Sequence, residues 1–201
     1  MPRTSFYILC LMFFALSFGV AAMAALVPSI AANFGVEANY AVRLTWLYML
    51  PYGVFALVWA PLTNIFKLKN LFLVICFGFF ISSLLFCFSK SIHQAFVFRF
   101  LMGAFGCGFV PLSLITVGKA VKNKSRSKYI GSLFAVSYVS TFISVFLSGF
   151  LSWRIIYSIP VVLGLTAFIL ALVSLNDFDF RKKQFKITYL DTLKNKKALC
   201  F

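Results

Sequence analysis

Long apolar runs, each followed by a short polar or basic segment, dominate the sequence. Runs without charge cover about residues 6–32, 44–66, 71–88, 100–118, 129–151 and 155–175. Because the ~30 Å hydrocarbon core of a bilayer needs about 20 apolar residues in a helix, this pattern predicts six transmembrane helices with short connections. Strands of a membrane barrel would alternate between apolar and polar positions, which segments such as Leu84–Phe88 do not. We therefore expect an all-α membrane protein.

Composition supports this class. Apolar residues make up 62% of the chain and charged residues only 11%, whereas soluble domains are usually about 45–50% apolar. A disordered chain is excluded for the same reason, since disorder requires low hydrophobicity.

The basic residues are unevenly placed, and their position predicts orientation. Of the 19, four (Arg43, Lys90, Arg99 and Arg154) fall on one side of the predicted spans. The other fifteen precede the first span or follow the second, fourth and sixth: Arg3, Lys67, Lys69, Lys119, Lys122, Lys124, Arg126, Lys128, Arg181, Lys182, Lys183, Lys186, Lys194, Lys196 and Lys197. By the positive-inside rule, both termini are expected in the cytoplasm, with the protein in the cell (inner) membrane. The charge is then explained by topology and the lipid bilayer, so we expect no nucleic-acid partner.

Two other features have simple interpretations. Ala22–Ala24 resembles a signal-peptide cleavage site, but the apolar run continues to Ala32, which favours an uncleaved first span. The cysteines are five in number and four lie inside spans, as expected of small buried apolar side chains. No pair has metal-ligand spacing, and we expect neither a metal nor a cofactor.

An internal repeat links the first and fourth spans. Val27-Pro28 is followed by Gly35, and Val110-Pro111 by Gly118, with seven residues from Pro to Gly in both. Proline inside a spanning helix removes a backbone hydrogen bond and favours a kink. Matching kinks in the first helix of each three-helix block predict a 3+3 inverted repeat, as in secondary transporters.

The end of the chain differs from the rest. We expect residues 1–176 to form the transmembrane domain and residues 177–201 a basic cytoplasmic linker. The linker turns apolar again at Ala198–Phe201, which predicts the start of a missing seventh span. A segment that docks on the membrane interface is the alternative.

Several motifs together resemble the N-terminal six-helix half of the major facilitator superfamily. Within it, Leu26–Gly35 resembles the end of the first helix in the drug-efflux branch. Arg99-x-x-x-Gly103-x-x-Gly106 matches the helix-four pattern of that family, and Trp153-Arg154 matches the start of helix six. The loop after helix two resembles the Gly-x-x-x-Asp-Arg-x-Gly-Arg-Lys signature in degraded form, in which Asn64 replaces Asp, Lys67 replaces the second Gly, and Lys69 keeps its charge. The antiporter signature of helix five is missing.

The resemblance implies roles for these residues. Arg99, expected at the outer end of span four, would serve proton coupling or substrate polarity, or else extend to the outer interface. Gly103 and Gly106 would allow close helix contact. Asn64, Lys67 and Lys69 would form a cytoplasmic gating loop, unless Asn64 is only a polar turn residue.

Candidate residues for a substrate pathway come from four spans. Ser137, Thr141, Ser144 and Ser148 share one face of the fifth helix, where they line a pathway or simply pack helices. Tyr48, Tyr52 and Trp59 share a face of the second, where Tyr48 has the alternative of a place in the interfacial aromatic belt. The kink prolines Pro28 and Pro111 complete the set.

The acidic residues Glu37, Asp177, Asp179 and Asp191 all lie outside the spans, and the single histidine, His93, is expected in an outer loop beside Gln94. A hydrolase would need a nucleophile and base or a zinc motif inside the membrane, so we expect no enzyme. The sequence predicts part of a secondary carrier for a small solute, truncated or split, whose second six-helix half is a separate chain or lost. The alternative is a non-functional gene remnant or a six-helix membrane scaffold.

Overall fold

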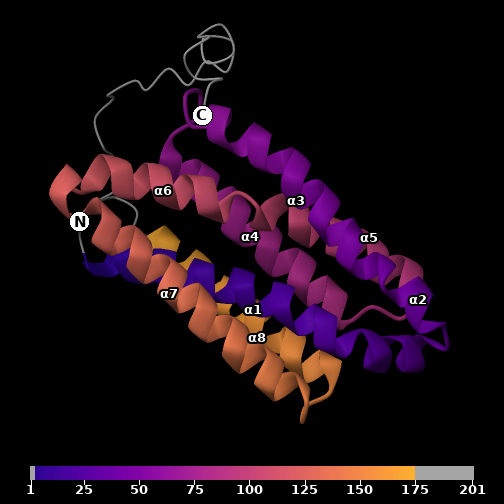
Figure 1. The fold of residues 1–201 in the computed structure, drawn as a ribbon. Coiled ribbons are helices and arrows are strands. Elements are labelled where there is room, and N and C mark those ends of the chain that lie inside the picture. Colours follow the sequence, from indigo (N-terminus) through magenta and orange to yellow (C-terminus); the bar gives the residue numbers. More distant parts are fainter. Residues whose placement is uncertain (1–2, 175–201) are drawn as a thin grey trace, which may run out of the picture.

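The computed structural model of the chain describes residues 3–174, in which all regular structure is helical (Figure 1). The helices are α1 (Arg3–Phe34), α2 (Ala38–Ala41), α3 (Arg43–Leu62), α4 (Leu68–Cys87), α5 (Ile92–Gly106), α6 (Phe109–Ala120), α7 (Asn123–Ser148) and α8 (Trp153–Ser174). The predicted linker at 177–201, with Asp177, Asp179 and Asp191, lies outside the described residues.

Six stretches of the described chain are long and apolar enough to cross a membrane, as the sequence predicts. They are Thr4–Phe34, Ala38–Leu62, Leu68–Cys87, Ile92–Ala120, Asn123–Ser148 and Trp153–Val173. The short helix α2 and α3 together form the second span, and α5 and α6 together form the fourth. The all-α, six-span fold class is confirmed.

The start of the fourth span was wrongly predicted. The charge-free run begins at residue 100, but the helix begins at Ile92, where the Ser91 side chain caps it by accepting from the Gln94 N–H. His93 and Gln94 therefore lie in the first helical turn and not in a loop. Arg99 lies seven residues inside the helix, about 10 Å from its start at 1.5 Å per residue. Treating charged residues as span boundaries caused both errors.

Packing between the spans follows the expected repeat. The first span (α1) packs against the fifth (α7) and sixth (α8), and the fourth span packs against the second (α3) and third (α4). The third and sixth spans pack against each other. Exchanging the first three spans with the last three leaves this list unchanged. Because corresponding helices are three spans apart along the chain, they run in opposite directions, as an inverted repeat requires.

The two repeated prolines act differently on their helices. Pro28 lies inside the continuous helix α1, whereas the fourth span is interrupted at Cys107–Gly108, just before Pro111. Proline cannot donate to the carbonyl four residues earlier, which here belongs to Cys107. At the break, the Gly108 N–H bonds to the carbonyl of Phe105, three residues earlier in the chain, at 3.2 Å. We expected matching kinks in the two blocks, but a helix break occurs only in the second block.

Candidate functional site

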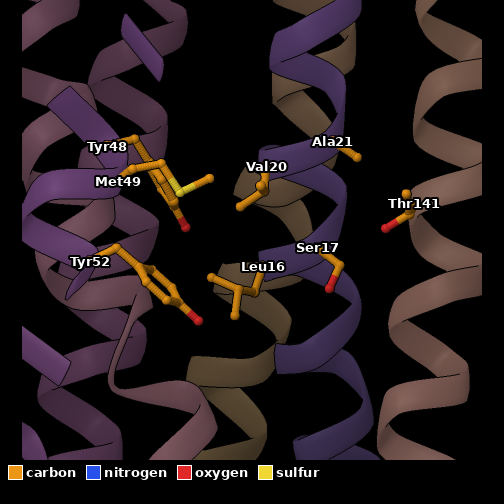
Figure 2. A pocket seen from close by; sticks show the side chains of 8 residues that line it. All are labelled: Leu16, Ser17, Val20, Ala21, Tyr48, Met49, Tyr52 and Thr141. Atoms are coloured by element: carbon orange, nitrogen blue, oxygen red, sulfur yellow. The ribbon is translucent and has the colours of Figure 1, made fainter. Parts of the chain in front are cut away.

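A pocket of about 440 Å³ opens between the first, second and fifth spans (Figure 2). Tyr48 and Tyr52 extend from α3 toward α1, and Thr141 extends from α7 toward α1 on the other side. Leu16, Ser17, Val20, Ala21 and Met49 complete the wall. Its size suits a small organic molecule.

The pocket contains three of the predicted pathway residues. Tyr48 and Tyr52 stack with ring centroids 5.9 Å apart, and Tyr48 is buried, which excludes the interfacial-belt alternative for it. Thr141 is exposed toward the pocket. Pro28 and Pro111 do not line it.

Arg99 lies behind Tyr48, fully inside the bundle. Its side chain is 1% exposed, so it does not extend to the outer interface. The guanidinium carbon lies 4.7 Å from the centre of the Tyr48 ring, 5.4 Å from that of Tyr157 and 5.6 Å from that of Phe86. These distances are within the range of cation–π attraction. Three spans besides its own therefore supply rings around this charge.

Two hydrogen bonds from this cluster end on the same backbone carbonyl. Arg99 Nη1 donates to Gly19 O at 3.4 Å and Tyr157 Oη donates to the same oxygen at 3.0 Å. Arg99 Nε and Tyr48 Oη are buried and have no hydrogen-bond partner. Within residues 3–174 no carboxylate lies in salt-bridge contact with Arg99, and Glu37 is the single acid in that range.

The two glycines of the helix-four motif lie at close contacts with neighbouring helices. A Cβ at Gly103 would collide with the carbonyl oxygen of Tyr48 and lie 3.0 Å from the Pro51 ring. A Cβ at Gly106 would lie 3.0 Å from Leu16 and 3.1 Å from Tyr48 Oη. The glycines thus let α3 lie against α5 with Tyr48 between Arg99 and the pocket.

The hydroxyl side chains along α7 have three different arrangements. Ser144 donates to Phe18 O and Ser140 to Phe14 O, each at 2.7 Å, so both tie α7 to α1. Ser137 bonds within its own helix, to Leu133 O at 3.3 Å, and Ser148 to Ser144 O. Thr141 alone of these side chains lines the pocket.

Sequence reasoning missed Ser140 and two of the three ring partners of Arg99, Phe86 and Tyr157. Ser140 stands three residues after Ser137 and four before Ser144, a spacing that places it on the same face. Phe86 and Tyr157 gave no signal beyond being aromatic residues in apolar spans. Trp59, grouped with the pathway tyrosines, instead donates from Nε1 to Ala104 O at 2.8 Å and joins α3 to α5.

The predicted gating loop connects α3 to α4. Asn64 is exposed in the turn, and its backbone N–H donates to Pro61 O at 2.9 Å. Lys67 is the N-cap residue of α4 and Lys69 lies in its first turn. At the next junction on the same end, Arg126 bonds to the carbonyls of Val121 and Gly118 and closes the end of α6.

Two inverted three-span blocks around a buried arginine define a helical membrane protein of the secondary-transporter class. The family model of the Major Facilitator Superfamily matches residues 8–188. The chain belongs to this superfamily. Its members are carriers and not enzymes, in agreement with the sequence prediction.

Fungal transporters are among the relatives. The "MFS-type transporter ppz2" of Metarhizium majus (strain ARSEF 297) is 27% identical over 156 residues, which cover 74% of this chain and 26% of the relative. An "MFS-type transporter" of Aspergillus terreus (strain NIH 2624 / FGSC A1156) is 31% identical over 94 residues, 45% of this chain and 17% of the relative. The chain thus spans about a quarter or less of these relatives.

Proposed function

We propose that this chain forms one half of a secondary carrier for a small solute, with the pocket between α1, α3 and α7 as its share of the binding site. The observation that carries the proposal is the buried charge of Arg99 behind the pocket wall. An arginine inside a span is costly, and such residues usually face a substrate path or a partner.

The exposed faces of α3 and α7 support a second six-helix half as the partner. These two helices flank the pocket, and less than a quarter of their most apolar segment is buried. Large apolar side chains that are more than half exposed lie on both: Trp46, Leu50, Val54 and Leu57 on α3, and Tyr138, Phe142 and Phe146 on α7. Carriers of this kind bind solute between two halves, so a second half would cover these faces and close the pocket.

The proposed arrangement in the membrane rests on charge. The basic junctions α3–α4 and α6–α7 follow even-numbered spans, so they share one end of the bundle with the N-terminus. We place this end in the cytoplasm by the positive-inside rule and the protein in the cell membrane. Residues 177–201 would then form a cytoplasmic linker that leads to the second half.

A direct test uses the chain in phosphatidylcholine nanodiscs and isothermal titration with the apolar probe 2-naphthamide. Ala21→Trp fills the pocket, so we expect it to abolish binding, whereas Ala135→Trp, on an exposed part of α7, should not. Binding that Ala21→Trp does not change would refute the site.

Transport itself needs the partner. Sequencing the DNA beyond the Phe201 codon in all frames shows whether six further apolar spans follow. If they do, co-expression of both parts should give solute uptake that neither part gives alone. If co-expressed parts give none, the gene-remnant or scaffold alternative holds, which the exposed Asn64 and the degraded signature loop around it favour. In an active carrier, Asn64→Asp with Lys67→Gly should raise the rate, because a charged acceptor forms stronger hydrogen bonds.

A further inference from the structure

The charge of Arg99 is not balanced within the described chain. Its Nη1 bonds to a neutral backbone carbonyl, Gly19 O, and its Nε has no partner. The carboxylate of Glu37 lies in the loop between α1 and α2 and makes no salt bridge with it. The remaining contacts are the rings of Tyr48, Phe86 and Tyr157.

Packing does not explain an arginine at this position. Removing a guanidinium from water is costly unless its donors are paired, and three ring contacts with one carbonyl bond still leave Arg99 Nε without an acceptor. An apolar side chain of similar length would fill the same volume without that cost. The charge therefore indicates a ligand that binds some of the time.

The pocket provides the route to this charge. Tyr48 belongs both to the pocket wall and to the ring cluster, 4.7 Å from the guanidinium carbon. Its hydroxyl is a second buried donor without a partner. For Arg99 Nε and Tyr48 Oη both to donate to a group in the pocket, the inference requires that this one side chain rotate away from the wall.

We propose that the solute is an aromatic or apolar oxyanion whose carboxylate pairs with Arg99 and accepts from the Tyr48 hydroxyl. This inference rests on the proposed function and adds the chemical class of the solute. The guanidinium fork matches the two oxygens of a carboxylate. The rest of the pocket, with Tyr52, Met49, Leu16 and Val20, suits an apolar or aromatic body.

The test compares three probes of one shape and different charge in phosphatidylcholine nanodiscs. They are 2-naphthoate, neutral 2-naphthamide and the cation 2-naphthylmethylammonium. We expect naphthoate to bind at least about tenfold more tightly than the amide, as a charge-assisted bidentate pair predicts. The cation should bind most weakly of the three.

Variants identify the group responsible. Arg99→Gln should abolish the preference for naphthoate while the amide still binds, and Tyr48→Phe should reduce the preference by about two- to fivefold through loss of one donor. Arg43→Gln is the matched control, because Arg43 also lies over a tyrosine ring, Tyr40 at 4.6 Å, but is exposed and outside the pocket. It should leave the preference unchanged.

The failures are distinguishable. Equal binding of naphthoate and amide, or a preference that survives Arg99→Gln, overturns the inference but leaves the proposed pocket standing. A preference that disappears when the second half is co-expressed shows that a carboxylate of that half pairs with Arg99, which also overturns it. Absence of any binding that Ala21→Trp blocks refutes the proposed function and this inference together.

Discussion

In each repeat the first span packs against the second span of the other repeat, and these two related contacts are held by different groups. Between α1 and α7, the hydroxyls of Ser140 and Ser144 bond to carbonyls of α1. Between α3 and the fourth span, Gly103 lies against the backbone of Tyr48 and Trp59 bonds to Ala104 O. At the hydroxyl contact, a substitution removes one hydrogen bond at a time. At the glycine contact, even the Cβ of an alanine would collide with the facing backbone.

The repeats also differ at the position of the buried charge. Arg99 lies twelve residues before Pro111, and the same distance before Pro28 leads to Leu16. Leu16 is buried and lines the pocket from one side, and Arg99 lies behind its wall on the other. The matching residue of the first repeat is apolar, and this departure from the repeat is the position that we propose as functional.

The largest effect is expected at the glycine contact. Gly103→Ala should lower the free energy of unfolding by about 3 kcal/mol, the upper end of the cost of overpacking, because the new Cβ meets a backbone oxygen. Gly19→Ala is the control, since its Cβ would lie 3.7 Å from Pro160 in ordinary contact. Thermal unfolding in detergent measures both. If the two variants unfold alike, the contacts do not differ as described.

Replacing the charge by an apolar side chain of similar length should separate function from stability. Arg99→Met keeps the length and removes the unpaired charge, so unfolding should occur at an equal or higher temperature. Binding of 2-naphthoate should fall at least about tenfold. A variant that loses stability in step with binding would show that Arg99 is a structural residue.

A smaller effect is expected at Trp59. Trp59→Phe removes the bond from Nε1 to Ala104 O and should cost about 1.5 kcal/mol of stability, the upper end for a buried hydrogen bond, since Ala104 O keeps the Cys107 thiol as a donor. Trp46→Phe, on the same helix but 71% exposed, should cost nothing measurable. Denaturation of the two variants side by side in detergent checks this.

The smallest effect is expected at the hydroxyl contact. Ser140→Ala with Ser144→Ala should cost about 1 kcal/mol, because one such bond between membrane helices averages about 0.6 kcal/mol. Ser132→Ala, whose hydroxyl bonds within its own helix, is the control. A loss as large as that of Gly103→Ala would remove the contrast between the two contacts.

Hydrophobic length predicts the six spans because each must cross the bilayer on its own. It placed the start of the fourth span wrongly, since a buried arginine reads in sequence as the end of a span. The matching prolines Pro28 and Pro111 indicate the inverted repeat in the sequence. The sequence does not predict that only the helix at Pro111 breaks, because each proline lacks the same backbone donor.

The candidate site was only partly predictable. Arg99, Tyr48, Tyr52 and Thr141 could be selected because polar groups are rare in spans. Phe86 and Tyr157 could not, because contacts between distant spans decide which aromatic rings face a charge and which face lipid. The acceptor of Arg99, the Gly19 carbonyl, is a backbone group that every residue carries, so no sequence pattern marks it.

The central claim is that the pocket between α1, α3 and α7 is a water-accessible solute site. The most direct measurement is the rate at which a membrane-impermeant methanethiosulfonate labels Thr141→Cys in nanodiscs, after the five cysteines have been replaced by alanine. The control is Val162→Cys on α8, an exposed residue outside the pocket. The account predicts rapid labelling of Thr141→Cys, slowed by Ala21→Trp, and little labelling at residue 162. Labelling of Thr141→Cys as slow as that of Val162→Cys would show that lipid fills this hollow and would contradict the account.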